Sequence, residues 1–227
     1  MRIVTYNTRG SLGMDGLRST RRIVETVRAV SPDIVCFQEI HQRLAWSGRE
    51  DQPAVLSAQL KRVCIFQRNL HFGFGGYGIA IAFRGDLAST KEHLLPSAKE
   101  QRGALEVRLR NVGGLRSLTV FCTHWGLQEE ERKLQADALS ELVAAAPGPV
   151  IVCGDLNENA TGLAARHLIT KTGLIDAGSE HNCETFVSLN PTERIDFILY
   201  QPELTLQHTE VITSLASDHL PVLADFV

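Results

Sequence analysis

The chain has 227 residues, of which 44% are hydrophobic and 22% charged, as in an ordinary soluble globular protein. Its formal net charge of -3 removes the main argument for a protein that coats long duplex nucleic acid. No leader-like segment precedes the first predicted strand, no apolar run could span a membrane, and the five cysteines form no C-x-x-C pair, so we expect a reduced, cytoplasmic protein.

The first part of the chain predicts a strand–helix–strand unit. An apolar strand over residues 3–6 leads to Asn7, and apolar residues near helical spacing predict a helix over 16–30. A second buried strand over 34–37 ends near Glu39. Both strands therefore place a polar residue at the carboxyl end, where ligands collect in α/β proteins.

Shorter elements follow this unit. A short helix is predicted over 53–61 and a strand over 63–66. The glycine-rich segment 73–78 only superficially resembles a phosphate-binding loop, because a strand over 79–83 follows it in place of a helix. We interpret the segment as a tight turn that lets strands pair closely.

The middle of the chain predicts a hairpin and a long helix. Strands over 103–109 and 117–122 are joined by a turn at 111–114. The helix over 128–146 has an acidic first turn, which suits the helix dipole. Four apolar residues recur at every fourth position and predict its buried face: Leu134, Ala138, Leu142 and Ala146.

The last third of the chain predicts a strand over 150–153, a helix over 160–171, and strands over 194–200, 210–212 and 222–226. No linker, low-complexity tract or internal repeat divides the sequence. We therefore expect one domain over residues 1–227.

Polar side chains stand at strand ends, or inside strands, where packing does not require them: Asn7, Glu39, His124, Asp155, Asn157, Asp196, Asp218 and His219. Each has an ordinary alternative: Asp155 could form an Asx turn, His124 could be a core histidine, and Asp196 could pair with Arg194. Their repetition makes a shared site the better interpretation. Burying several acids without counter-charges is unfavourable, so a cation or mutual pairing is implied.

The donor atoms indicate which cation this would be. The carboxylates and amides of Asn7, Glu39, Asp155, Asn157 and Asp218 offer oxygen, which suits Mg²⁺ or Mn²⁺. No cysteine or paired-histidine spacing suggests structural zinc. A metal, two histidines and an arginine fit hydrolysis of a phosphate ester. Acyl transfer by a serine triad fits poorly, because no G-x-S-x-G motif occurs.

Six ordered motifs resemble the endonuclease/exonuclease/phosphatase superfamily, whose members include deoxyribonuclease I: 5–7 (TYN), 38–39 (QE), 123–124 (TH), 154–157 (GDLN), 194–196 (RID) and 217–221 (SDHLP). The resemblance runs from residue 2 to residue 227 and suggests a small bacterial-type member. It implies an α/β fold, a four-layer αββα sandwich of two mixed β-sheets.

The resemblance also implies roles on the metal side. Glu39 matches the principal metal-binding glutamate, and Asp218 matches the last metal-side carboxylate. Asn7 matches an asparagine that supports the metal and its bound phosphate. Asp155 and Asn157 match residues that position the attacking water, and they are counted with the metal-binding set. One or two Mg²⁺ or Mn²⁺ ions are implied.

On the phosphate side, His219 matches a histidine that stabilises the transition state, and Asp196 matches the acid that fixes its tautomer. His124 matches a second phosphate-contacting position, which some relatives fill with tyrosine. Arg102 stands where many small members have an arginine that reaches the site. The alternative for Arg102 is an exposed arginine that opens a strand.

Departures from the subfamily patterns leave the substrate open. His124 disfavours an abasic-site endonuclease, and the residues flanking 154–157 do not match the inositol 5-phosphatase pattern. No membrane-seeking insertion typical of sphingomyelinases is evident. Five residues are candidates to line a groove that stacks a base or another ring, with core or loop positions as the alternative: Trp46, His71, Phe72, Phe74 and Trp125.

The sequence predicts a metal-dependent phosphodiesterase that acts on a nucleic acid or a small molecule by in-line attack of activated water. One alternative is a phosphomonoesterase acting on a sugar, inositol or nucleotide phosphate. The other is a non-catalytic nucleic-acid-binding module of the same fold. We expect no membrane association and no obligate protein partner.

Overall fold

A computed structural model describes residues 1–180 and 183–227, in which twelve strands form two six-stranded sheets. The first sheet has the order β11-β12-β1-β2-β4-β3. Its strands are β1 (Arg2–Asn7), β2 (Ile34–Gln42), β3 (Val63–Phe72), β4 (Gly75–Phe83), β11 (Leu206–Val211) and β12 (Val222–Phe226).

The second sheet has the order β5-β6-β7-β8-β10-β9. Its strands are β5 (Asp86–Leu94), β6 (Gly103–Val112), β7 (Leu115–His124), β8 (Val150–Asp155), β9 (Ile175–Asp176) and β10 (Asp196–Tyr200). Both sheets are mixed, because β1 pairs with β2 and β7 pairs with β8 in parallel, whereas the other pairs are antiparallel.

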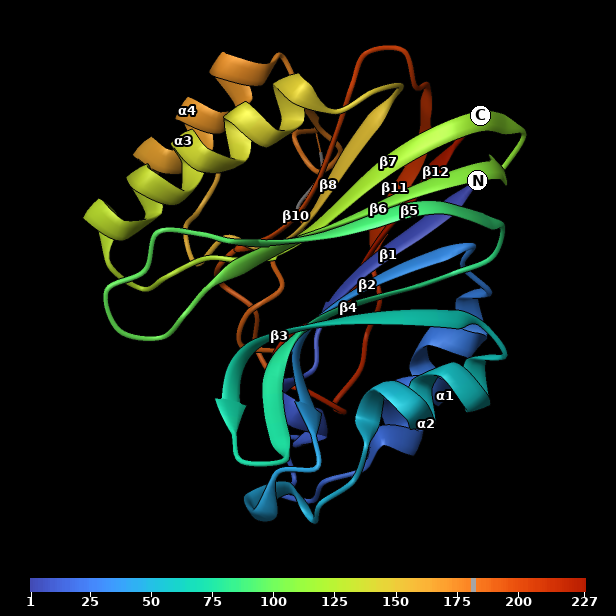
Figure 1. Ribbon diagram of the computed structural model, residues 1–227, viewed down its shortest axis with the longest axis vertical. Coiled ribbons are helices and arrows are strands. Elements are labelled where there is room, and N and C mark those ends of the chain that lie inside the picture. The colour runs from blue at the N-terminus through green and yellow to red at the C-terminus, as the bar shows by residue number, and fades with distance from the viewer. Residues whose placement is uncertain (181–182) are drawn as a thin grey trace.

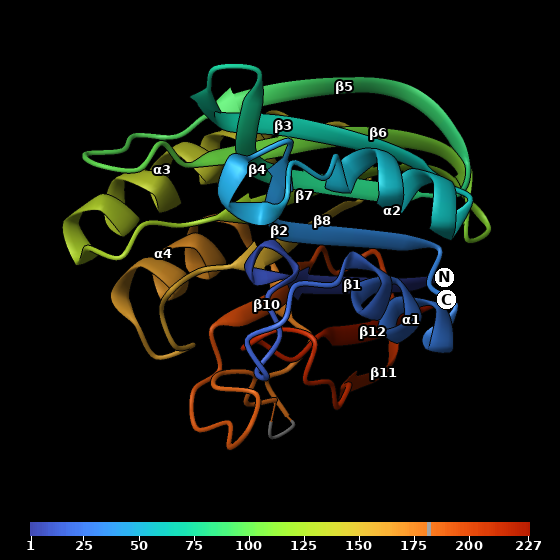
Figure 2. The same ribbon diagram turned by 90° about the horizontal axis from the view of Figure 1, so that it is seen from below.

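Helices cover the outer faces of both sheets. Helices α1 (Thr20–Val30) and α2 (Gln52–Leu60) lie on one side, and α3 (Glu129–Ala145) and α4 (Leu163–Thr172) lie on the other, with the sheets between them (Figures 1 and 2). The predicted four-layer αββα sandwich is therefore confirmed. Among the described residues, no helix is both long and apolar enough to cross a bilayer.

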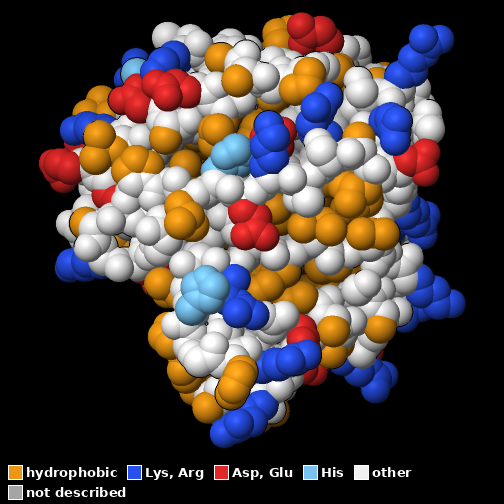
Figure 3. Space-filling view, viewed as in Figure 1, with side chains coloured by type: hydrophobic (Ala, Val, Ile, Leu, Met, Phe, Trp, Pro, Cys, Tyr) orange, Lys and Arg blue, Asp and Glu red, His pale blue; other side chains and the backbone are white. Residues whose placement is uncertain are grey.

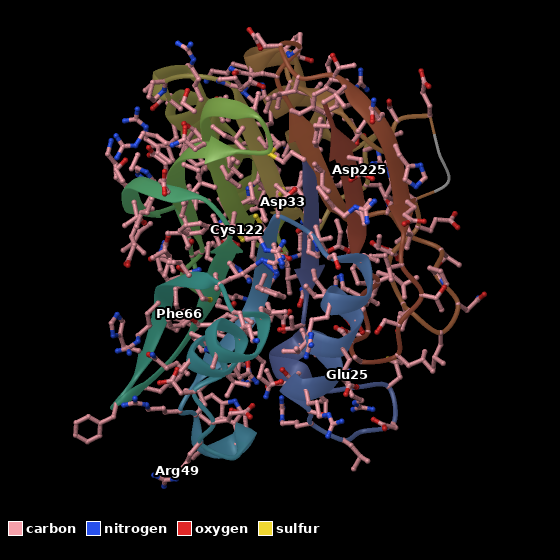
Figure 4. All side chains as sticks on the ribbon, turned by 90° about the vertical axis from the view of Figure 1, so that its right-hand side faces the viewer. Glu25, Asp33, Arg49, Phe66, Cys122 and Asp225 are labelled. Carbon is pink, nitrogen blue, oxygen red and sulfur yellow. The ribbon has the colours of Figure 1, made fainter. Side chains whose placement is uncertain are left out.

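Three hydrophobic cores correspond to the three contacts between layers. One fills the space between the sheets and includes the buried thiols of Cys36, Cys122 and Cys153, with Cys122 deep in the interior (Figure 4). A second lies between α3, α4 and the second sheet, and a third lies between α1, α2 and the first. All five cysteines are unpaired.

The topology places the functional residues at one end of the sandwich. The two termini meet at the other end, where the amino group of Met1 donates to the carbonyl oxygen of Phe226 at 2.6 Å (Figure 1). Because β1 begins at that end, Asn7 lies at the opposite one. The carboxyl ends of β7 and β8 also reach this opposite end, since Asn7 contacts Asp155 there.

Two helix predictions need correction. Helix α1 begins at Thr20, not at residue 16, because Leu17 is exposed and Arg18 forms an isolated β-bridge with Leu12. The buried face of α3 is Gln135, Ala136, Leu139, Ser140 and Val143, whereas Leu134 is 57% exposed. The predicted buried face of α3 is therefore displaced by about one residue around the helix axis from the observed one. Ala138, Leu142 and Ala146 are partly buried at the edge of the packing against the second sheet and α4.

The strand predictions missed β5 and shortened several others. Strand β5 is mostly exposed and pairs with β6 along a sheet edge, so its sequence lacks the apolar alternation that indicates a strand. The glycine-rich segment opens β4. A side chain at Gly78 would bring its Cβ within 1.9 Å of the Gln67 carbonyl oxygen on β3, which explains why close pairing requires glycine there.

Candidate active site

Three of the predicted residues lie side by side on adjacent strands of the second sheet. His124 is opposite Asp155 in the β7–β8 pair, and Asp196 is opposite Asp155 in the β8–β10 pair. All three side chains are buried, with Asp155 and Asp196 each 1% exposed. A parallel and an antiparallel ladder thus bring together residues that are far apart in the sequence.

The first sheet contributes Asn7 and Glu39. The Asn7 side-chain amide donates to Asp155 Oδ2 at 2.9 Å and to Glu39 Oε1 at 3.1 Å. The side-chain oxygen of Asn7, Oδ1, accepts the backbone N–H of Arg9 at 3.1 Å. Asn7 therefore holds two carboxylates through its amide, Glu39 within the first sheet and Asp155 across the space between the two sheets.

Glu39 occupies an irregular position within β2. The strand was expected to end near this residue, but it continues to Gln42, with a register shift between Phe37 and Ile40. Glu39 has φ 56°, an uncommon value for a residue with a side chain. Such a bulge redirects a side chain, and backbone strain of this kind clusters at functional sites.

Asn157 also has a left-handed backbone, with φ 49°, which asparagine tolerates better than most residues. Its N–H donates to Asp155 Oδ1 at 2.9 Å, so the Asx turn considered from the sequence does form. Its side-chain amide donates to the carbonyl oxygen of Trp125 at 2.8 Å. One oxygen of Asp155 thus closes the turn, and the other faces Asn7 and the histidines.

His219 and Asp196 form a hydrogen-bonded pair behind Asp155. His219 Nδ1 lies 2.8 Å from Asp196 Oδ2, which also accepts the hydroxyl of Thr185 at 2.6 Å. His219 Nε2 lies 3.7 Å from Asp155 Oδ2. Burial opposes protonation of His219, but Asp196, Asp155 and Asp218 outweigh it and raise the pKa of His219 to about 10. His219 is therefore an imidazolium at neutral pH.

His124 differs from His219 in charge. Burial, together with the nearby positive charges of Arg102 and His219, holds the pKa of His124 well below its usual range. Arg102 Nη1 lies 2.9 Å from His124 Nδ1 and 3.2 Å from its Nε2, so the shorter contact favours a neutral ring that accepts at Nδ1 and carries its proton on Nε2. That nitrogen lies 3.5 Å from Asp155 Oδ2. Arg102 is 5% exposed, so the alternative of an exposed arginine is wrong.

Asp218 forms an ion pair with Arg9, a residue that was not predicted from the sequence to belong to the site. Its Oδ2 pairs with Arg9 Nε at 3.2 Å, and the neighbouring Ser217 hydroxyl donates to the carbonyl oxygen of Asn7 at 2.8 Å. Arg9 lies two residues after Asn7, in a short turn, η1 (Arg9–Ser11). The available signal was a basic residue close to Asn7 in the loop that follows β1.

A cavity of about 490 Å³ joins most of these groups. Seven predicted residues line it: Glu39, Arg102, His124, Asp155, Asn157, Asp218 and His219. Asn7 and Asp196 are fully buried behind this lining. The cavity also has walls that were not predicted, including Glu100, Tyr77 and Phe186, whose ring centroid lies 4.8 Å from that of His219.

Comparison with known proteins agrees with this geometry. The model of the Endonuclease/Exonuclease/phosphatase family matches residues 4–219. The chain belongs to this family. Members of the family hydrolyse phosphoesters, and they typically use divalent metal ions.

Similar proteins span several activities. A family protein from Beutenbergia cavernae has a TM-score of 0.86 at 23% identity, covering 100% of this chain and 71% of that one. A mannosyl-6-phosphatase of Bacteroides thetaiotaomicron has a TM-score of 0.84 at 21% identity, covering 100% of this chain and 99% of that one. The human Nocturnin catalytic domain with bound sulfate has a TM-score of 0.79 at 23% identity, covering 100% of this chain and 94% of that one. At these identities the likeness shows the fold alone.

A curated relative, the uncharacterized protein YbhP of Escherichia coli K12, is 28% identical over 149 residues. The matched stretch covers 59% of this chain and 57% of YbhP, so the chain spans little more than half of that relative's length.

The buried carboxylates provide a test of whether this family member could hold a cation. Burial raises the pKa of Glu39, although the hydrogen bond from Asn7 opposes the shift. Burial and the charge of Asp196 raise the pKa of Asp155. A raised pKa means that the charged form of the carboxylate is not fully compensated by nearby positive charge. The oxygens of Glu39 and Asp155 that face the cavity therefore fit a hard divalent cation.

The position of that cation follows from the oxygens that remain free. Asp155, Asp196 and His219 bring one ligand atom each within 4.8 Å of one another. However, Asp196 Oδ2 already serves His219 and Thr185, and Asp196 does not line the cavity although its Oδ1 has no hydrogen-bond partner among the described residues, which favours a positioning role for that residue. The better donor set is the one facing the cavity: Glu39, Asp155, Asn157 and Asp218.

The predicted ring-stacking groove is only partly present. Trp46 and Phe72 line the cavity. Trp125 is fully buried in the core beside α3, so its prediction as a groove residue is wrong and the core alternative holds. His71 and Phe74 are exposed on the β3–β4 hairpin, outside the lining of the cavity.

Proposed function

We propose that the chain is a divalent-metal-dependent phosphodiesterase that cleaves a nucleic acid or a small-molecule diester by in-line attack of water. The observation that carries this proposal is the environment of Asp155 Oδ2. Asn7 approaches this oxygen from the other sheet, and the ring nitrogens of His124 and His219 lie 3.5 Å and 3.7 Å away. A carboxylate oxygen beside two histidines that can donate to phosphoryl oxygens suits phosphoester hydrolysis.

Glu39, Asp218, Asp155 and Asn157 would hold one or two Mg²⁺ or Mn²⁺ ions, and Asn7 would align two of these carboxylates. A bound ion would neutralise charge on the phosphoryl oxygens and increase the acidity of the attacking water. Among these residues, Asp218 has a competing cation, since Arg9 pairs with it. Arg9 would turn toward the phosphate when Asp218 takes up the ion.

Asp155 acts as the base in this proposal. Burial and the charge of Asp196 raise the pKa of Asp155, so its carboxylate in the metal-free protein takes up a proton more readily than an ordinary aspartate does. Its Oδ2 accepts the proton of the attacking water, while Asn157 orients that water from the cavity wall. The Asx turn fixes the other oxygen, so the basic one cannot rotate away.

The histidines and Arg102 stabilise the transition state. Protonated His219 donates from Nε2 to a phosphoryl oxygen while Asp196 holds its other nitrogen. Neutral His124 donates from Nε2 as well, because the shorter contact of Arg102 is with its Nδ1. All of these residues come from one chain, so we propose that catalysis needs no protein partner.

A phosphomonoesterase is the second candidate, because the site lies in a bounded cavity of about 490 Å³ that admits a small substrate. Long nucleic acid gains little support from the surface, since basic side chains are dispersed among acidic and hydrophobic ones on the face shown in Figure 3.

The test compares bis(4-nitrophenyl) phosphate with 4-nitrophenyl phosphate, each with Mg²⁺, with Mn²⁺ and with a chelator. Metal-dependent release of nitrophenolate, faster from the diester, is expected. Faster release from the monoester would favour the second candidate. Binding of nucleic acid without turnover of either ester under any condition would favour a non-catalytic module and would contradict the proposal.

A further inference from the structure

The cavity has two chemically different halves. One half holds the charged groups described above. The other half is built from rings and aliphatic side chains: Trp46, Leu70, Phe72, Tyr77 and Leu127. A phosphate bound at the charged half would therefore leave the organic part of the substrate facing the apolar half.

A continuous row of rings leads from the rim of the cavity inward. The ring centroids of Phe72 and Trp46 lie 5.0 Å apart, those of Trp46 and His41 lie 6.5 Å apart, and those of His41 and Tyr77 lie 5.7 Å apart. These rings come from β3, η2 (Ala45–Ser47), β2 and β4, so the row depends on the tertiary fold. Figure 1 shows the loop after β2 next to the β3–β4 hairpin.

The two outer rings are unusually open to solvent. Trp46 is 55% exposed and Phe72 is 45% exposed, although each contacts the other edge to face. Large exposed apolar side chains at the rim of a cavity mark ligand-binding sites. Arg49, which follows η2 in the chain, projects outward at this end of the molecule (Figure 4).

The polar residues near the apolar rings are few: His41, Glu100 and the hydroxyl of Tyr77. Glu100 pairs with Arg102 at 2.8 Å. His41 is 7% exposed, and its ring lies between those of Trp46 and Tyr77. This wall therefore offers little to the many hydroxyls of a sugar and much to a flat ring.

We propose that the substrate is a phosphate ester whose organic part carries a planar aromatic ring, as in a nucleoside phosphate, and that this ring stacks on Trp46 and Phe72. The inference rests on the proposed function for the position of the phosphate. A bound divalent ion, together with Arg102 and His219, would place the anion at the charged half, and the rings place the base at the rim. Trp46 and Phe72 then determine specificity.

A matched pair of ligands tests this proposal without turnover. Adenosine 5′-monophosphate and ribose 5-phosphate differ by the base alone, and their affinities can be measured by calorimetry with Mg²⁺ present. Stacking on one aromatic side chain predicts that the nucleotide binds about 5- to 100-fold more tightly. Trp46→Ala and Phe72→Ala should each reduce this ratio, and Trp46→Phe should restore most of it.

Leu163→Ala provides the control, because Leu163 is 58% exposed on α4, away from the cavity. Equal affinities for the two ligands, no measurable binding of either, or a ratio unchanged by Trp46→Ala would overturn the inference. An oligonucleotide that binds more tightly than the mononucleotide in both wild type and Trp46→Ala would also overturn it. Because binding is the readout, the inference can hold even if no ester is hydrolysed, and it can fail while hydrolysis is observed.

Discussion

The amide of Asn7, at the end of β1, donates to Asp155 Oδ2, at the end of β8, across 2.9 Å. This bond joins the two sheets at the point where the proposed chemistry takes place. The same amide holds Glu39 at 3.1 Å. A single neutral side chain therefore sets the relative positions of the proposed base and the proposed principal metal-binding residue.

Asn7→Asp should make the metal-free protein less stable. The change replaces the shared donor by a third carboxylate next to Asp155 and Glu39, and like charges at such distances repel strongly when buried. Thermal unfolding should show a lower Tm in chelator, with partial recovery in Mg²⁺ or Mn²⁺. An unchanged Tm in chelator would contradict the proposed role of Asn7 in holding the two acids apart.

Glu39→Gln should separate metal binding from folding. The substitution keeps the shape of the side chain but removes a buried charge whose pKa is raised by burial, so the metal-free protein should be at least as stable as wild type. The increase in Tm that a divalent ion gives the wild type should largely disappear, since an ion stabilises only through the sites that bind it. A full metal-induced increase in the variant would remove Glu39 from the ligand set.

Asp196→Asn should change the pH dependence of catalysis. Asp196 is the largest of the causes that raise the pKa of His219 to about 10, so its neutralisation lowers that pKa. Protonated His219 is then lost at a lower pH, and the alkaline limb of the kcat/KM profile moves to lower pH. At neutral pH we expect a decrease of about 10- to 100-fold. A lower rate with an unmoved alkaline limb would indicate that Asp196 acts only as a structural residue.

Much of the site could be predicted because its residues follow apolar strands in a fixed order. Asp155 and His124 are recognisable at the carboxyl ends of strands, and Asp196 was predicted inside the strand 194–200 but opens β10; the sheets then align all three. The bulge at Glu39 was not predictable, because a register shift is set by the partner strand β4. The pairing of Arg9 with Asp218 was also missed, since it joins loops 209 residues apart in the sequence.

The helix α3 shows a second limit of pattern reasoning. Gln135 is fully buried, although a polar residue is usually assigned to the solvent face. Its side-chain oxygen accepts the N–H of Gly126 at 2.7 Å, and its amide donates to the carbonyl oxygen of Pro96 at 2.9 Å. Hydrophobic periodicity does not detect a buried amide whose hydrogen bonds go to backbone groups of two loops. The predicted face of the helix was displaced for this reason.

Gly154→Ala should destabilise the fold next to the proposed base. An added Cβ would lie 2.1 Å from the carbonyl oxygen of Thr123 on β7, so the two strands would have to separate. Overpacking of this kind costs about 1–3 kcal/mol in the free energy of unfolding. Denaturant unfolding measures this cost. A free energy equal to that of wild type would show that the strands can separate freely.

The central claim is that Asp155 serves as the base in metal-dependent phosphoester hydrolysis. Its most direct test is the rate of nitrophenolate release from bis(4-nitrophenyl) phosphate with Mn²⁺, measured for wild type, Asp155→Asn and Asp137→Asn. Asp137 is exposed on α3 and, among the described residues, pairs only with the surface side chains of His167 and Lys171, so its variant is the matched control. We predict that Asp155→Asn loses at least about 100-fold in kcat, whereas Asp137→Asn keeps the wild-type rate. Wild-type turnover in a folded Asp155→Asn variant would contradict the account.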